Sequence, residues 1–257
     1  MSVAGRHALV TGGARGIGLA VATLLLERGA RVSIVSRTPH GSPTKDDEGT
    51  PPSHRHDRFF RAQADVTDEV QVHRAFEACR EANGSIEILV NNSGIAESAP
   101  IARTGTAMWN RTIATNLTGT FLCTREVVGA MIAARWGRIV NVASTAGLGG
   151  APYLSAYCAS KHGVIGLTRA LSAELSKNGI TVNAICPGYT EGELLERAIV
   201  NVIAKTGRTP EEARAQLAQS NPEGRIATAD EVARAVLELI EGSHSGSALV
   251  IPGGALK

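Results

Sequence analysis

The sequence lacks the features that mark several classes of protein. Its 257 residues carry a formal net charge of only +2, so we expect neither nucleic acid nor an anionic membrane as a partner. No apolar run reaches the length needed to cross a bilayer. Residues 1–6 lack the basic-then-apolar layout of a signal peptide, and we therefore expect a cytoplasmic protein.

Cysteine is scarce, and internal repeats and linkers between domains are missing. The cysteines stand far apart, with spacings that fit no metal site: Cys79, Cys123, Cys158 and Cys186. We expect free thiols that mainly pack in the core, and no bound metal. The length suits one large domain, so the prediction is a single unit over residues 1–257.

What the chain does contain is an alternation of short apolar runs and longer helical patterns. The runs, which we expect to be strands, are residues 8–10, 31–35, 59–64, 86–91, 138–142, 181–185 and 248–251. The helical patterns are residues 16–28, 68–82, 116–134, 155–177 and 229–241. This order predicts a single-domain, Rossmann-type α/β fold: a doubly wound parallel sheet of about seven strands with helices on both faces.

Two segments interrupt the alternation. Residues 39–57 are rich in Pro, Gly, Ser and His with mixed charge, a composition typical of a mobile surface loop. Residues 189–221 are helical in pattern but stand between two core strands. A helical insertion at such a position predicts a lid over a substrate site.

The first expected strand leads into a glycine-rich loop, Thr-Gly-Gly-Ala-Arg-Gly-Ile-Gly, at residues 11–18. In a strand-loop-helix context, its first glycine permits a tight turn, the next lets the backbone approach a pyrophosphate, and the last allows close helix packing. The helix N-terminus adds free amides and a partial positive charge. We expect this loop to bind a dinucleotide through Gly12, Arg15, Gly16, Ile17 and Gly18.

The end of the second expected strand bears on the choice of nicotinamide. An acidic residue there would accept hydrogen bonds from the ribose and indicate NAD(H), but the chain has Ser36 and Arg37, with Arg15 nearby. Two guanidinium groups suit a 2′-phosphate, so NADP(H) is favoured and NAD(H) stays open. Asp65, followed by Val66, either meets the adenine amino group or caps the next helix.

Three further side chains carry the signature of proton transfer: Ser144, Tyr157 and Lys161. Tyr157 and Lys161 are four residues apart in a helical pattern and share a face. An adjacent ammonium favours the phenolate and lowers the pKa of a tyrosine, which makes the pair an acid or base for a carbonyl or alcohol oxygen. Ser144, at the end of the fifth expected strand, can hydrogen-bond the same oxygen.

In order and spacing, these pieces resemble the short-chain dehydrogenase/reductase family over essentially the whole chain. The resemblance is carried by residues 11–18, Asn-Asn-Ser-Gly at 91–94, Asn116, Ser144, Tyr-Cys-Ala-Ser-Lys at 157–161, and Pro187-Gly188. It implies that Tyr157 is the general acid/base and that Lys161 lowers its pKa and holds the nicotinamide ribose. It further implies that Ser144 orients the substrate oxygen and that Asn116 holds a water for proton relay.

The resemblance also implies further cofactor contacts and an assembly. The expected cofactor contacts are Asn92, Gly94, Pro187 and Gly188. The family forms dimers or tetramers through the helices expected at 116–134 and 155–177. Two departures concern the site: Ser93 stands where the family often has Ala, and Gly192 where it often has a Thr that bonds the carboxamide. Thr190 is then the expected replacement.

The sequence says less about the substrate than about the cofactor. The expected wall, Ile95, Leu154 and Tyr189 with Ser144 and Tyr157, is mostly small or apolar, which favours an apolar or acyl-type ketone over a polyol. Residues 211–225 resemble reductases of 3-oxoacyl thioesters. The hypothesis is an NADP(H)-dependent oxidoreductase of ketones and secondary alcohols. Its rivals are an NAD-dependent dehydrogenase of a small alcohol, sugar or steroid, and a non-catalytic dinucleotide-binding protein, which would need no matched acid and base.

Overall fold

The apolar runs form one parallel sheet of seven strands in the order β3-β2-β1-β4-β5-β6-β7. The computed structural model describes residues 2–38 and 58–251, so the loop expected at 39–57 lies outside the described residues. The strands are β1 (His7–Thr11), β2 (Arg31–Ser36), β3 (Phe59–Gln63), β4 (Ile88–Asn91), β5 (Gly137–Val142), β6 (Ile180–Pro187) and β7 (Ala248–Ile251). The predicted fold class is confirmed.

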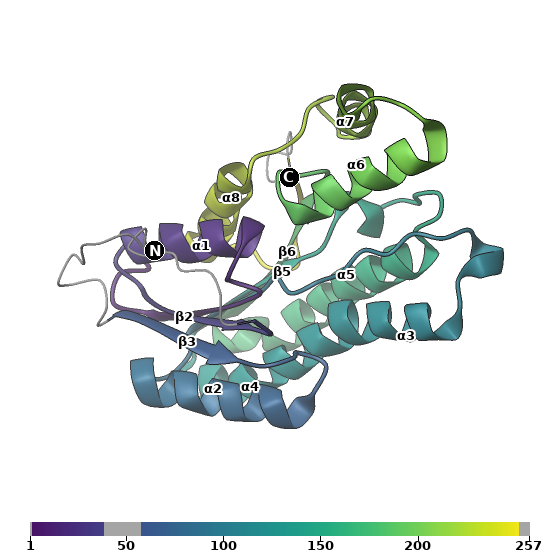
Figure 1. Cartoon of the computed structure of the whole chain (residues 1–257). Coiled ribbons are helices and arrows are strands. Elements are labelled where there is room, and N and C mark those ends of the chain that lie inside the picture. Colours follow the sequence, from purple (N-terminus) through teal and green to yellow (C-terminus); the bar gives the residue numbers. More distant parts are fainter. Residues whose placement is uncertain (1, 39–57, 252–257) are drawn as a thin grey trace.

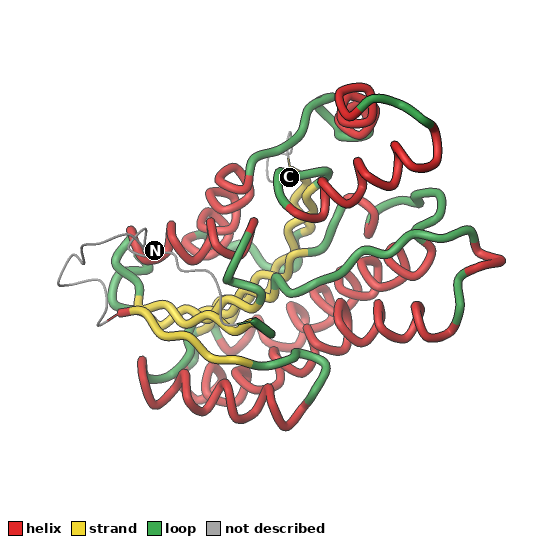
Figure 2. The backbone as a smooth tube through the Cα atoms, viewed as in Figure 1, coloured by secondary structure: helices red, strands yellow, loops and turns green. Residues whose placement is uncertain are grey.

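Helices cover both faces of this sheet (Figures 1 and 2). One face carries α1 (Gly16–Glu27) and α8 (Ala229–Glu241), and the other carries α2 (Glu69–Asn83), α4 (Gly119–Ala134) and α5 (Ser155–Leu175). The remaining helices, α3 (Thr106–Ile113), α6 (Glu193–Thr206) and α7 (Pro210–Gln219), lie toward the end of the molecule at which the strands finish.

Alternate side chains of each strand enter two apolar layers. In β1, Ala8 and Val10 pack with α1 and α8, whereas Leu9 packs with α2 and α4. Because both faces are covered, every residue of β1, β4, β5 and β6 is buried. Three of the four cysteines belong to this core, as expected, and all four are free; Cys158 is partly exposed.

The strand order reverses between β1 and β4, which pair with each other at the centre of the sheet. In open α/β sheets, a crevice forms at such a point beyond the carboxyl ends of the strands. The loop after β1 and the segment after β4 therefore meet there, with the ends of β5 and β6 beside them.

One helix begins earlier than the sequence predicted. Helical structure is continuous from Thr106 to Ala134, through a π-helical turn at Ala114–Thr118, instead of starting at residue 116. An 18-residue window of this 29-residue helix has a mean hydropathy of 1.2, so the helix is long and apolar enough to cross a membrane, contrary to the expectation that no such run exists. Core helices of soluble proteins share these properties, and Cys123, Val127 and Met131 pack here against the sheet.

The helical insertion at 189–221 contains two helices, α6 and α7, with an apolar core of their own. That core contains Leu195, Ile199, Ala213 and Leu217. The break follows from local chemistry: Gly207 ends α6 in the left-handed region, and Thr209 starts α7 with a capping box and Pro210 at the first turn.

Candidate active site

The loop after β1 is shaped by glycines that no larger residue could replace without strain. Gly12 and Gly16 have φ of +64° and +53°, in the left-handed region. A Cβ on Gly18 would lie 2.3 Å from the carbonyl oxygen of Gly12, so α1 packs directly on the loop, as predicted. Ile17 turns inward and packs against the sheet core.

The N-terminus of α1 offers amides for an anion. Arg15 occupies the N-cap position, and its side chain makes no capping hydrogen bond. The first amides of the helix are therefore not capped by the side chain of the N-cap residue. Together with the narrow glycine turn, this arrangement fits the pyrophosphate of a dinucleotide. The Arg15 guanidinium itself forms an ion pair with Glu193, the first residue of α6.

Ser36 and Arg37 stand at the tip of β2, beside Asp65 at the end of the β3 segment. The guanidinium of Arg37 is 4.0 Å from the carboxylate of Asp65. The suggestion that Asp65 caps the next helix is wrong, because the side chain of Asp68 accepts the hydrogen bond from the Gln71 amide. Asp65 instead accepts from the amide and hydroxyl of Thr67, at 2.9 and 2.8 Å. Its neighbour Val66 is buried against Gly119.

Ser144, Tyr157 and Lys161 come together from β5 and α5. Ser144, directly beyond the β5 segment, accepts a hydrogen bond from the Ala146 amide at 3.2 Å and is hydrogen-bonded to the Tyr157 hydroxyl. Burial raises the pKa of Tyr157, and the hydrogen bond from Ser144 opposes that shift. We expected Lys161 to lower the pKa of Tyr157, but in this structure burial dominates and the pKa is raised.

The reason lies in where the Lys161 ammonium points. Its Nζ is 5.7 Å from the centre of the Tyr157 ring and donates a hydrogen bond of 2.7 Å to the carbonyl oxygen of Val142. Lys161 is 4% exposed, and burial lowers its pKa to about 8. The Lys161 ammonium is thus held next to the Tyr157 ring, and its pKa lies close to neutral pH.

Asn116 completes this cluster from the π-helical turn of the long helix. Its side chain donates to the carbonyl oxygen of Ile95 at 2.9 Å and to the hydroxyl of Ser160 at 3.0 Å, and accepts from the Ile95 amide at 2.8 Å. A Cβ on Gly94 would lie 3.3 Å from Oδ1 of Asn116 and 3.6 Å from Nζ of Lys161. The side chains of Asn116 and Lys161 therefore converge at Gly94. The π-helical turn that carries Asn116 is a feature frequent at functional sites.

Asn92 ties the segment after β4 to the glycine loop. Its side-chain amide donates to the carbonyl oxygens of Thr11 and Gly12, both at 3.1 Å. The Thr11 hydroxyl in turn accepts from the amides of Asn92 and Ser93, at 3.0 and 3.1 Å. These bonds fix the distance between the loop expected to hold the phosphates and the strand end beside Gly94.

The end of β6 is held by a residue whose role the sequence did not indicate. Asn221 is 5% exposed and accepts from the Tyr189 amide at 2.6 Å, while it donates to the carbonyl oxygens of Tyr189 and Arg225, both at 2.7 Å. A Cβ on Gly188 would lie 2.2 Å from Oδ1 of Asn221, so only glycine fits beside it. Pro187 ends β6, and the Thr190 hydroxyl donates to the Gly188 carbonyl oxygen at 3.2 Å.

The residues expected to line the substrate side come from three segments around Tyr157. Ile95 is fixed by Asn116, and Leu154 precedes the first turn of α5. Tyr189 packs with the α6–α7 core, and burial raises its pKa. All three are partly buried. Among residues 2–38 and 58–251, no group of three His, Cys, Asp or Glu side chains could hold a metal ion.

The comparisons with known proteins agree with this geometry. The model of the family described as "short chain dehydrogenase" matches residues 6–202. The chain belongs to the short-chain dehydrogenase family. The 3-oxoacyl-[acyl-carrier-protein] reductase MabA of Mycobacterium avium is 36% identical, over 97% of this chain and 89% of its own. The cis-4-hydroxycyclohexanecarboxylate dehydrogenase of Sinomonas cyclohexanicum is 38% identical, over 97% and 96%.

Solved structures of short-chain dehydrogenases superpose closely on this one. A single-residue variant of actinorhodin polyketide ketoreductase with NADPH gives a TM-score of 0.89, with 35% identity and 96% of each chain covered. Levodione reductase gives a TM-score of 0.89, with 32% identity and 97% of each chain covered. The family assignment makes the protein an oxidoreductase that acts on CH–OH groups or the corresponding carbonyls.

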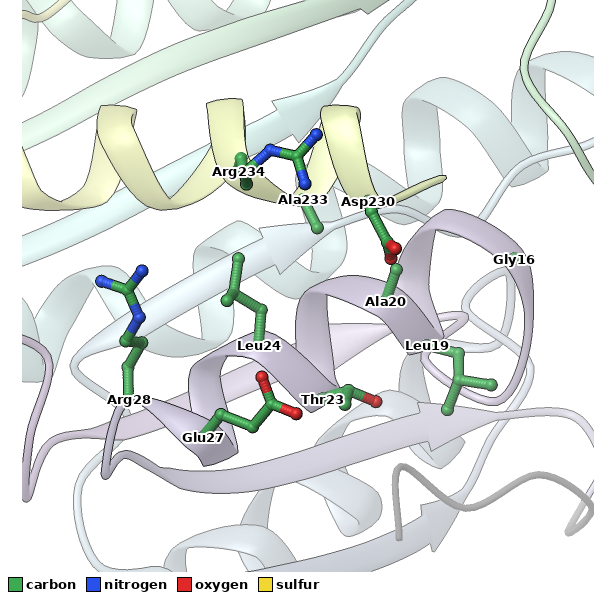
Figure 3. Close-up of a pocket in the computed structure, with 10 residues that line it drawn as sticks. All are labelled: Gly16, Leu19, Ala20, Thr23, Leu24, Glu27, Arg28, Asp230, Ala233 and Arg234. Atoms are coloured by element: carbon green, nitrogen blue, oxygen red, sulfur yellow. The ribbon is translucent and has the colours of Figure 1, made fainter. Parts of the chain in front are cut away.

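A separate hollow of about 500 Å³ lies between α1 and α8 (Figure 3). Leu19, Ala20 and Ala233 line it from the two helices, and Asp230 of α8 points toward Ala20 of α1. Of its lining residues, only Gly16 belongs to the glycine loop. The hollow is thus a groove between packed helices, distinct from the cluster around Tyr157.

Proposed function

We propose that this short-chain dehydrogenase catalyses NADP(H)-dependent interconversion of ketones and secondary alcohols. The observation that carries the proposal is the convergence of Ser144, Tyr157 and Lys161 at the carboxyl ends of β5 and β6, beside a glycine loop that fits a dinucleotide. A protein that only bound the dinucleotide would not need a tyrosine and a lysine paired beside it.

The residues for the cofactor form a path from β2 to β6. Gly12, Gly16, Ile17 and Gly18 would hold the pyrophosphate on the N-terminus of α1. Arg15, Ser36 and Arg37 would hold the 2′-phosphate, and Asp65 with Val66 the adenine. Asn92, Gly94, Lys161, Pro187, Gly188 and Thr190 would surround the nicotinamide riboside. When bound, the cofactor supplies the hydride, while the protein orients the substrate and polarises its carbonyl group.

The proton would be handled by Tyr157. In the reductive direction its hydroxyl donates a proton to the carbonyl oxygen of the ketone, which Ser144 holds by a hydrogen bond. A raised pKa keeps Tyr157 protonated and suits this role. Lys161, directly beneath, stabilises the phenolate that remains, and Asn116 links Lys161 to the proton relay.

The substrate we favour is an apolar or acyl-type ketone, such as a 3-oxoacyl thioester. Two lines of support are that relatives of this chain include 3-oxoacyl-[acyl-carrier-protein] reductases and ketoacyl reductases, and that the wall of Ile95, Leu154 and Tyr189 offers apolar surface. Residues 189–221 would act as the lid over this substrate.

We also propose a cytoplasmic homo-oligomer, a dimer or tetramer, that associates through the long helices α4 and α5. Phe121 on α4 is 43% exposed and Ile132 is 38% exposed, which leaves apolar surface on the face away from the sheet.

Two measurements test the proposed function. Fluorescence titration should give an affinity for NADPH at least about tenfold tighter than for NADH, the ratio expected for one or two charge-assisted contacts to a phosphate. Tyr157→Phe should keep the NADPH affinity and lose turnover of ketones by about 10²–10⁴-fold. An equal affinity for the two cofactors would overturn the choice of NADP(H) and favour an NAD-dependent dehydrogenase. Unchanged turnover in the variant would overturn the mechanism.

A further inference from the structure

The helix α6 begins directly over the glycine loop. Gly192, its N-cap, has φ of +132°, and a Cβ there would lie 4.0 Å from the Cα of Gly16. This backbone conformation is one that L side chains rarely adopt, so glycine lets the chain turn into α6 at this place. The next side chain, Glu193, is thereby brought beside Arg15.

Glu193 holds two cations at once. One oxygen of its carboxylate, Oε2, pairs with Arg15, and the other, Oε1, pairs with Arg197 one turn further along α6. The two partners differ in kind. Arg197 is tied to the same helix, whereas Arg15 belongs to the glycine loop and is 70% exposed at its side chain. Of the two ion pairs of Glu193, the one with Arg15 is therefore the one that a competing anion could break.

Arg15 is also one of the two guanidinium groups that the proposed function assigns to a 2′-phosphate. The other, Arg37, lies 4.0 Å from the carboxylate of Asp65. A dianionic phosphate at this place would therefore meet two arginines that already face carboxylates. It would draw Arg15 away from Glu193 or accept the repulsion of that carboxylate.

We propose that Glu193 is a specificity-determining residue for the cofactor: it competes with the 2′-phosphate for Arg15 and so weakens binding of NADP(H) relative to NAD(H). Arg197 limits this competition, because it keeps the Glu193 carboxylate paired after Arg15 has turned to the phosphate. The proposal rests on the proposed function, since it concerns the same cofactor site. It assigns to the start of α6 a role in reading the adenosine end of the cofactor.

The test uses the adenosine halves of the two cofactors, which avoid any effect on catalysis. Wild type, Glu193→Gln and Glu196→Gln would be titrated calorimetrically with 2′,5′-ADP and with 5′-AMP. Glu196 is the matched control, because it is on the same helix and pairs with Arg214 at 3.8 Å. For these partly exposed charges, Glu193→Gln should tighten 2′,5′-ADP by about three- to tenfold and change 5′-AMP by less than about twofold.

Two further arms sharpen the result. Arg197→Ala leaves Glu193 with Arg15 alone and should weaken 2′,5′-ADP, opposite to Glu193→Gln. The gain in Glu193→Gln should shrink as salt is raised from about 0.05 M to about 0.5 M, since the charges are near the surface.

The outcomes separate this inference from the proposed function. If wild type binds 2′,5′-ADP no better than 5′-AMP, the NADP(H) assignment fails; the role of Glu193 is then upheld if Glu193→Gln creates a preference and overturned if it does not. A second outcome is that wild type prefers 2′,5′-ADP, but Glu193→Gln binds it with the same affinity as wild type or as the Glu196→Gln control. The NADP(H) assignment then stands and the role of Glu193 is overturned.

Discussion

The buried ammonium of Lys161 should make the folded protein less stable at neutral pH than at alkaline pH. Burial lowers the pKa of Lys161 from 10.5 to about 8. Between these two pH values, the unfolded chain holds the proton while the folded protein has lost it. Because the unfolded chain then binds more protons, the free energy of unfolding rises with pH over this window. Below pH about 8 the folded protein bears the full cost of the buried charge.

The size of the effect follows from the shift. The lowering from 10.5 to about 8 corresponds to about 3 kcal/mol at most. Linkage between pH 7 and pH 9.5 should stabilise the native protein by about 2 kcal/mol relative to Lys161→Met. The variant also loses the hydrogen bond to the Val142 carbonyl oxygen, a cost of about 1–3 kcal/mol. That cost is the same at both pH values and cancels in the difference.

Urea unfolding of the nucleotide-free protein at pH 7 and pH 9.5 measures this difference directly. Lys177→Met is the matched control, because Lys177 is exposed in the turn after α5 and should give a profile parallel to that of the wild type. The reasoning would be refuted if Lys161→Met were also parallel to the wild type, since Lys161 would then have the same pKa in both states.

Two further perturbations concern buried polar groups. His7 is fully buried with both ring nitrogens hydrogen-bonded, and burial lowers its pKa from 6.5. The stability that His7 contributes is therefore present above pH 6.5 and lost as the pH falls below it. In urea titrations, His7→Gln should lose less stability than wild type between pH 7 and pH 5, and an equal loss in both proteins would contradict this. Asn221→Leu strands the partners of three hydrogen bonds and should cost about 2–3 kcal/mol in thermal unfolding, whereas the exposed Asn201→Leu on α6 should cost almost nothing; equal losses in the two variants would count against the network.

The sheet was predictable because its strands are continuous apolar runs, whose ends differ from the predicted ones by no more than two residues. The first helical turns of the long helix were missed for the opposite reason. The α3 segment is short and Thr112 is its only buried residue, so it lacks the sustained apolar pattern that marks the other helices. The break between α6 and α7 was also not predicted, although Gly207 and Pro210 are ordinary stop and start signals.

In the candidate site, the sequence predicted which side chains meet but not how their charges are arranged. Tyr157 and Lys161 share a helix face through their spacing, and Ser144 joins them from the end of a strand. The resemblance to the family added Asn116. The raised pKa of Tyr157 depends on burial by parts of the chain far away in sequence. A pair four residues apart reveals the neighbour of a group, whereas its desolvation is a property of the whole fold.

The same distinction explains why Asn221 and Glu193 were not found. Each acts through contacts with a segment that the topology brings near: Asn221 with the end of β6, and Glu193 with the loop after β1. The groups proposed to handle the proton are attached to β5 and α5, whereas both of these contacts hold the α6–α7 segment to the rest of the site. Changes in α6 and α7 should therefore alter which cofactor and substrate bind, and leave the position of Tyr157 over Lys161 intact.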